Sequence, residues 1–262
     1  MACTPTYSDM HGIAQTMADR PGGGGTGPSQ TLIEELAIAN RILFREGVVD
    51  AFGHVSVRSD ADPHRYLLAR NMAPALVTPD DIVEFDADSN PLNANGRAVY
   101  LERFIHGEIY KARPDVVAVV HSHSPAVVPF GIVKTAKFRS VCHMSSFLPV
   151  CTPIFEIRDA AGEDNDLLIT SHALGAALAR VLGEGTCVLM RGHGSTVVAS
   201  NLREVVYRAV YTEVNAKLQS EAMRMGEVTY LNEKELVTTT RTIATQINRA
   251  WDFWRMRAEG KL

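Results

Sequence analysis

Short strand-like runs separated by turn residues constrain the fold of this chain most strongly. Four such runs occur in the first third of the sequence, divided by Asp, Pro and Asn, at residues 54–58, 66–69, 75–77 and 82–85. This pattern is typical of an antiparallel or mixed sheet. Apolar residues at helical spacing predict helices over 31–46, 97–113, 174–182, 202–225 and 233–257. We therefore expect an α/β fold with helices on both faces of a central sheet.

The N-terminal segment has a different composition from the rest of the chain. Residues 1–30 show no sustained periodicity, and they include a glycine-rich stretch from Pro21 to Pro28. Glycine-rich segments of this kind behave as flexible linkers. We predict a flexible N-terminal arm over residues 1–30 and a single domain with C-terminal helices over residues 31–262.

Composition excludes several classes of protein. The chain has 26 Lys and Arg against 30 Asp and Glu, and it has no dense basic run that would favour nucleic acid. No apolar stretch approaches the length of a membrane span, and the N-terminus lacks the pattern of a signal peptide. Four widely spaced cysteines, Cys3, Cys142, Cys151 and Cys187, indicate reduced thiols. We predict a cytoplasmic protein that binds neither nucleic acid nor membrane.

A pair of histidines at the end of an apolar run is the strongest chemical signal. His121 and His123 follow the run Val116–Val120. Residues two apart in a strand point to the same face, so the two imidazoles can chelate a divalent ion. Tight binding requires a third ligand, and two candidates exist. His193 lies between glycines after a predicted strand, and His106 lies on a predicted helix.

Glu102 is the candidate acid–base residue. It precedes His106 by four residues, on the same predicted helix face, just before the histidine strand. A carboxylate close to a divalent ion can act as a ligand, a general base, or both in turn. A helix glutamate exposed on the surface is the alternative.

Taken together, these motifs resemble the class II aldolase/adducin family over about residues 31–220. They are Glu102-x-x-x-His106-x-x-x-Tyr110, Arg113-Pro-Asp-x-x-Ala-Val-Val-His-Ser-His123 and Gly192-His-Gly194. The resemblance implies a three-layer α/β/α sandwich with a mainly antiparallel or mixed sheet. It also implies one divalent metal per chain, with His121, His123 and His193 matching the metal ligands. Glu102 matches the family's catalytic glutamate, so the resemblance favours His193 over His106.

The segments that bind phosphate in the family's sugar-phosphate enzymes differ here. Asp80 and Asp81 occupy one of them, and Tyr100 and Leu101 precede the glutamate in another. Phosphate requires backbone N–H groups and hydroxyls without a nearby anion. A sugar-phosphate substrate is therefore disfavoured. His54 stands where the family pattern has an amide.

The altered pocket is similar to a branch of the family that decarboxylates hydroxylated aromatic or heteroaromatic dicarboxylates. Residues 46–58 and 103–110 carry this likeness, which includes hydroxypyridine-dicarboxylate and dihydroxyphthalate decarboxylases. It implies a carbon–carbon lyase of aromatic catabolism acting on an ortho-hydroxy acid. His54 or Glu102 would donate the proton, and a retained carboxylate would pair with an arginine. The predicted substrate-binding residues are Arg70, Tyr100, Leu101 and Tyr207.

Alternatives remain open at this point. A metal-dependent aldolase acting on a non-phosphorylated hydroxy-keto acid uses similar chemistry, and an adducin-like scaffold keeps the fold without catalysis. Three imidazoles suit Zn²⁺, whereas an added carboxylate also suits Mn²⁺, Co²⁺ or Fe²⁺. The resemblance implies a homotetramer, and Trp251 and Trp254 in an apolar C-terminal segment are consistent with a subunit contact. His143 is interpreted as structural.

Overall fold

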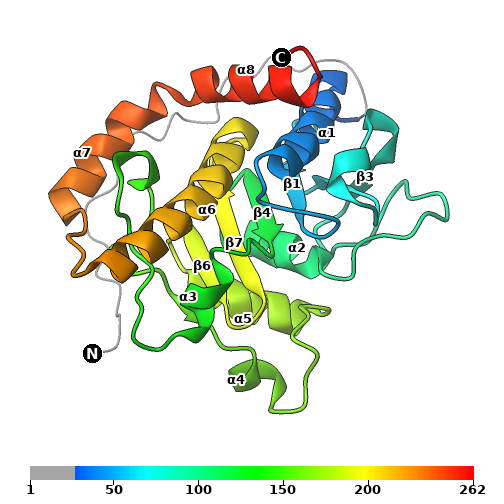
Figure 1. Ribbon diagram of the computed structural model, residues 1–262. Helices are drawn as coiled ribbons and strands as arrows, with labels where there is room; N and C mark the ends of the chain where they lie inside the picture. The colour runs from blue at the N-terminus through cyan, green and yellow to red at the C-terminus, as the bar shows by residue number, and fades with distance from the viewer. Residues whose placement is uncertain (1–26) are drawn as a thin grey trace.

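The computed structural model describes residues 27–262, in which a seven-stranded sheet lies between layers of helices (Figure 1). The strands are β1 His54–Arg58, β2 Tyr66–Ala69, β3 Ile82–Phe85, β4 Ala118–Ser122, β5 Ile154–Phe155, β6 Cys187–Met190 and β7 Gly194–Ala199. Their order across the sheet is β3-β2-β1-β4-β7-β6-β5. All neighbouring strands are antiparallel except β5 and β6, which are parallel. The predicted α/β sandwich with a mainly antiparallel sheet is confirmed.

The helices account for most of the remaining chain. They are α1 Gln30–Arg45, α2 Arg103–Ala112, α3 Val128–Ile132, α4 Arg158–Ala161, α5 His172–Leu182, α6 Leu202–Met225, α7 Glu233–Ala244 and α8 Ile247–Ala258, with the 3₁₀ turns η1 Pro74–Leu76, η2 Pro79–Asp81 and η3 His143–Ser145. Helices α1 and α6 cover one face of the sheet, and α2 and α5 pack together on the other (Figure 1). Within residues 27–262, none of these helices combines the length and the hydropathy needed to span a bilayer.

Strand β4 forms the middle of the core and carries the histidine motif to one edge. Its residues Ala118, Val119 and Val120 are completely buried, because both faces of the strand are covered. A strand buried on both faces has a continuous apolar sequence rather than an alternating one. The run ends at His121, which pairs in register with His54 on β1 and with Thr196 on β7.

Three predicted elements differ from the structure. Residues 75–77 were expected as a strand, but Ala75 and Leu76 belong to the turn η1 and Val77 caps it, because Pro74 begins a 3₁₀ turn there. The helix expected over 97–113 begins only at Arg103. Residues 97–102 before it form neither helix nor strand, and the Asn71 N–H donates a backbone hydrogen bond to the carbonyl of Ala98.

The C-terminal helix is also divided. Residues 233–257 were expected as one helix but form α7 and α8, which are separated at Thr245 and Gln246. Thr245 Oγ1 donates to the carbonyl of Thr242, so its hydroxyl competes with the helical backbone bonds. The threonine-rich sequence before this point also has low helix propensity. The helix therefore stops and starts again.

Most of the predicted N-terminal arm lies outside the described residues. Its last two residues belong to the fold, since Ser29 caps α1 by accepting a hydrogen bond from the Leu32 N–H and Gln30 begins the helix. Cys142 and Cys187 are free thiols, as expected. Cys151 is in a disulfide, so the expectation of reduced thiols is wrong at that position.

Candidate metal centre and its surroundings

The end of β4 places two imidazoles side by side. His121 is the fourth residue of the strand and is completely buried, and His123 follows the strand's last residue. Because the two residues are separated by one position in extended backbone, both rings project to the same side. Their Nε2 atoms lie 3.1 Å apart. The geometry predicted from the His-x-His spacing is therefore present.

His193 reaches the same point from the turn between β6 and β7. Its Nε2 lies 2.8 Å from Nε2 of His123. Gly192 in this turn has φ +66°, which is a conformation that favours glycine. The Nδ1–H of His193 donates to the carbonyl of Leu167 at 2.8 Å, so a neutral His193 has its lone pair on Nε2. The turn and this hydrogen bond together aim Nε2 at the other histidines.

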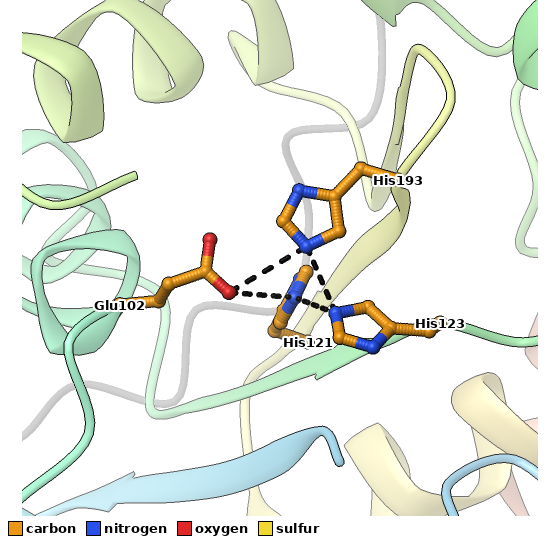
Figure 2. A group of neighbouring side chains, drawn as sticks. All are labelled: Glu102, His121, His123 and His193. Atoms are coloured by element: carbon orange, nitrogen blue, oxygen red, sulfur yellow. Dashed lines mark hydrogen bonds and ion pairs between the residues drawn. The ribbon is translucent and has the colours of Figure 1, made fainter. Parts of the chain in front are cut away.

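Glu102 closes the group from the opposite side. It is the N-cap residue of α2 rather than part of the helix, and its side chain is buried. Its Oε1 accepts a hydrogen bond from the Ile169 N–H at 2.9 Å. Its Oε2 lies 3.5 Å from Nε2 of both His121 and His193. Figure 2 shows the carboxylate facing the three rings from across the site.

These four side chains form a donor set that fits a divalent metal ion. One ligand atom from each residue lies within 4.8 Å of all the others. The measured separations of 2.8–3.5 Å match the distances of about 2.9–3.4 Å between ligands that bind one ion at about 2.0–2.1 Å. Three imidazoles and a carboxylate suit Zn²⁺, Mn²⁺, Co²⁺ and Fe²⁺. The cluster could hold such an ion.

The electrostatics of the cluster agree with this assignment. Burial acts to raise the pKa of Glu102, but the adjacent His121 and His193 hold that pKa far below its ordinary value, so the side chain is a carboxylate. Burial lowers the pKa of His123 to about 4. Burial opposes protonation of His193 as well, but its contact with Glu102 raises the pKa of His193. The negative charge of Glu102 therefore favours a positive charge at this point of the cluster.

His54 lies beside the cluster, at the start of β1. Its ring centroid is 5.1 Å from that of His121 and 4.6 Å from that of Tyr100. Burial, and then the neighbouring His106 and His121, push the pKa of His54 well below its ordinary value. A neutral His54 therefore lines the wall next to the metal ligands.

His106 does not join the four-residue group. Its Nε2 is hydrogen bonded to Nδ1 of His54, and its Nδ1 is hydrogen bonded to Oγ of Ser56. The choice of His193 over His106 as the third imidazole therefore agrees with the geometry. The contact of His106 with Glu102 that its spacing suggested is replaced by these two bonds.

Arg70 and Tyr100 are held by specific partners. Arg70 Nε donates to Asp81 Oδ1 at 2.7 Å, and Oδ2 of Asp81 accepts from the backbone N–H and the hydroxyl of Thr78. The hydroxyl of Tyr100 donates to the carbonyl of Met72 at 2.5 Å, which leaves its ring against His54. Leu101 is 59% exposed next to Glu102.

Tyr207 is placed differently from the other predicted substrate-binding residues. It lies on α6, on the face of the sheet opposite α2 (Figure 1). Its hydroxyl donates to the carbonyl of Met144 at 2.8 Å, and its ring packs against Tyr211 and Trp254. These contacts give Tyr207 a packing role, and its role in substrate binding stays a prediction. His143 begins the turn η3 and is not part of the four-residue group.

Two kinds of contact were missed by sequence reasoning. The backbone groups of Leu167 and Ile169 orient His193 and Glu102, and no residue-type signal marks such contacts. The hydrogen-bonded chain from His54 to Tyr110 had a signal, since His106 and Tyr110 are four apart on one helix face. His54 and Ser56 likewise share one face of a strand.

Comparison with known proteins identifies the family of the chain and its named relatives. Residues 34–220 match the family described as the class II aldolase and adducin N-terminal domain. The chain is 38% identical over 241 residues to decarboxylase tropJ of Talaromyces stipitatus, covering 83% of this chain and 90% of that protein. It is 30% identical over 207 residues to the 3,4-dihydroxyphthalate decarboxylase of Arthrobacter keyseri, covering 74% and 79%. Both relatives are named as carboxy-lyases, in agreement with the predicted enzyme class.

A solved structure supports the fold independently. L-fuculose 1-phosphate aldolase from Glaciozyma antarctica superposes with a TM-score of 0.72 at 21% identity, covering 88% of this chain and 91% of that chain. The match to the family spans most of the described residues and includes all four members of the histidine–glutamate cluster. The chain belongs to the class II aldolase and adducin family.

Proposed function

We propose that this protein is a metal-dependent, non-oxidative decarboxylase of an ortho-hydroxy aromatic or heteroaromatic acid in a catabolic route. The convergence of three imidazoles and Glu102 on one point carries the proposal. The named activities of the two sequence relatives above support a carboxy-lyase rather than a scaffold.

The proposed ligands are His121, His123 and His193, with Glu102 beside them. One divalent ion held there would act as a Lewis acid that stabilises negative charge on the substrate oxygen conjugated to the breaking bond. The Ile169 N–H fixes one oxygen of Glu102, so the other oxygen remains directed at the bound substrate. Glu102 can then accept the proton of the substrate's ortho hydroxyl.

The carbon–carbon bond breaks after a proton reaches the ring carbon that bears the carboxylate. Protonation at that carbon turns the ortho-hydroxy acid into a species resembling a β-keto acid. Loss of CO₂ then returns the electron pair of the broken bond to the ring. Glu102, once it has accepted the hydroxyl proton, can return that proton to the ring carbon. His54 is the other group proposed from the sequence for this step.

The walls of the site support an aromatic substrate. The ring of Tyr100 packs against His54, and Leu101 exposes an apolar side chain next to Glu102 in the sequence. Arg70 uses Nε for Asp81, and no hydrogen bond of its two Nη groups is found within residues 27–262. A guanidinium with free Nη groups can pair with a carboxylate that the product retains. Tyr207 is kept as a further proposed contact.

Release of CO₂ from a panel of acids tests the proposal. The zinc- or manganese-loaded protein is incubated with hydroxyphthalates and hydroxypyridine-dicarboxylates, and with their deoxy analogues and ketose 1-phosphates. We expect CO₂ from at least one hydroxy acid, none from its deoxy analogue, and no aldehyde from the phosphates. Faster cleavage of a sugar phosphate than of every aromatic acid would refute the substrate class. The exposed His64 provides a control, since His64→Ala should retain activity that His123→Ala loses.

The assembly and the cellular location of the protein are also part of the proposal. Phe52 is 65% exposed while its ring lies 6.4 Å from that of His123, so an apolar side chain stands open at the mouth of the site. Exposed apolar groups of this kind favour a subunit contact. We propose a cytoplasmic homotetramer in which residues 29–262 of each chain form one domain. Light scattering that gives the monomer mass of 28.6 kDa would contradict the tetramer.

A further inference from the structure

A buried chain of polar side chains leads away from the candidate metal centre. His54 Nδ1 lies 2.6 Å from His106 Nε2, and His106 Nδ1 lies 2.6 Å from Ser56 Oγ. Ser56 Oγ lies 2.7 Å from the hydroxyl of Tyr110, which in turn lies 3.4 Å from the carbonyl of Val117. None of His106, Ser56 or Tyr110 has a role in the chemistry described above.

The chain is built by one strand and one helix. His54 and Ser56 are two apart on β1 and face α2, while His106 and Tyr110 are four apart on α2 and face β1. All four side chains are buried. Buried polar groups must be hydrogen bonded, and here the short bonds of 2.6–2.7 Å run from one member to the next. Apolar side chains could fill the same space without this requirement, which suggests that the polar chain has a function.

The direction of the hydrogen bonds follows from the hydroxyl proton of Tyr110. A phenol has one proton to donate, and Ser56 at 2.7 Å is a much better acceptor than the Val117 carbonyl at 3.4 Å. Ser56 then accepts from Tyr110, so its own proton goes to Nδ1 of His106.

The same direction continues to His54. Burial lowers the pKa of His106 to about 3, so this imidazole is neutral and carries a single N–H. With Nδ1 of His106 accepting from Ser56, that N–H is on Nε2 and donates to Nδ1 of His54. A neutral His54 must then carry its proton on Nε2.

We propose that Tyr110, Ser56 and His106 are positioning residues that hold His54 in the Nε2–H tautomer, so that neutral His54 donates an Nε2–H hydrogen bond to the substrate oxygen on which negative charge develops. No hydrogen bond of His54 Nε2 is found within the described part of the chain, so this N–H is available to a substrate. The proposal rests on the proposed function, and it gives His54 the role of a hydrogen-bond donor, while proton transfer stays with Glu102.

The tautomer can be measured without any turnover. Solid-state NMR of the zinc-loaded protein with ¹⁵N-labelled histidine separates protonated from unprotonated ring nitrogens, and Zn²⁺ is chosen because it is diamagnetic. The His54→Gln variant identifies the two resonances of His54. We expect Nε2 protonated and Nδ1 unprotonated. A wild-type spectrum with His54 protonated on Nδ1 would overturn the proposed direction.

A matched pair of variants at His106 tests the contribution to rate. His106→Gln can still donate an amide N–H to His54, whereas His106→Leu cannot, and both leave Ser56 without its imidazole partner. We expect His106→Leu to lower kcat at least about 10-fold below His106→Gln with little change in KM, which is part of the about 10²–10³-fold effect of losing one hydrogen-bond donor to a developing negative charge. Melting temperatures of the two variants show whether they are equally folded.

The outcomes separate this proposal from the proposed function. Equal kcat values for the two His106 variants, in a protein that releases CO₂, would overturn the positioning role alone. Absence of CO₂ release from every substrate would contradict the decarboxylase assignment, while the NMR spectrum would still decide the tautomer of His54.

Discussion

Gly194 allows His193 to approach the end of β4, which leads to His123. Gly194→Ala should therefore separate these two histidines. A Cβ at this position would lie 2.0 Å from the Ser122 carbonyl oxygen and 3.1 Å from Cα of His123. Ordinary van der Waals contact begins at 3.4 Å, so the two backbones must separate by about 1.4 Å. His193 immediately precedes Gly194, so the shift acts directly between His123 and His193.

The magnitude of this shift decides the expected result. Ligand distances in metal sites tolerate about 0.2 Å, so a separation several times larger removes one ligand from the set. We expect the affinity for Zn²⁺ to fall at least about 100-fold. Overpacking should also destabilise the fold by about 2–3 kcal/mol, which lowers Tm by about 5–10 °C in a chain of this size.

Competition with a chromogenic zinc chelator measures the affinity, and calorimetry measures Tm. Gly192→Ala is the matched control, because the atom nearest to its new Cβ belongs to Leu167 and lies 3.9 Å away. An alanine at the Gly192 φ of +66° still destabilises the fold by about 1–2 kcal/mol. Both variants should lose stability, but only Gly194→Ala should lose zinc. Retention of wild-type zinc affinity by Gly194→Ala would refute the reasoning.

Three further predictions concern the chemistry of the site. Glu102→Gln should lower kcat at least about 10²-fold, because an amide cannot exchange protons, and steady-state kinetics measures this loss. Its Tm, measured by calorimetry, should be unchanged, because the amide oxygen can still accept the hydrogen bond from the Ile169 N–H. Metal affinity should rise as the pH rises through the raised pKa of His193, because at lower pH the ion must displace a proton from this imidazole. Titration calorimetry in buffers of different ionisation enthalpy should show proton release that disappears at high pH. Arg70→Met should lower kcat/KM about 10²-fold for a dicarboxylate and hardly at all for the matching monocarboxylate, since only the former has a second carboxylate to pair.

The parts of the fold that follow a single periodicity were predictable. Helix α6 was expected over 202–225 and has those bounds, because it begins at a capping Asn201 and ends before Gly226. The His-x-His pair was predictable because strand geometry alone determines that its rings share a face. Recognition of the family then selected His193, which lies 70 residues further along the chain.

The parts that depend on tertiary contacts were not predictable. The segment before α2 reads as helix, but its backbone is engaged by Asn71, and helix propensity does not report such a contact. The chain from His54 to Tyr110 requires knowing that β1 and α2 lie against each other. Each of its residues taken alone looks like an ordinary buried polar group.

The structure also changes the physical argument against a phosphate substrate. From the sequence, Asp80 and Asp81 were expected to repel a dianion. In the structure the Asp81 carboxylate is neutralised by Arg70 and by two hydrogen bonds from Thr78, which hold its pKa below the ordinary value despite partial burial. Repulsion by Asp81 is therefore weak.

Phosphate is disfavoured because the local hydrogen-bond donors already have partners within the chain. The Thr78 hydroxyl and backbone N–H, which a phosphate would need, are already occupied by Asp81. The same carboxylate orients Arg70 through Nε and leaves its Nη edge for a ligand. A planar guanidinium edge matches a carboxylate in two parallel hydrogen bonds. The loop that cradles phosphate in related enzymes thus supports, in this chain, an arginine suited to a carboxylate. The proposed selectivity of the site for an aromatic acid over a sugar phosphate rests on that exchange.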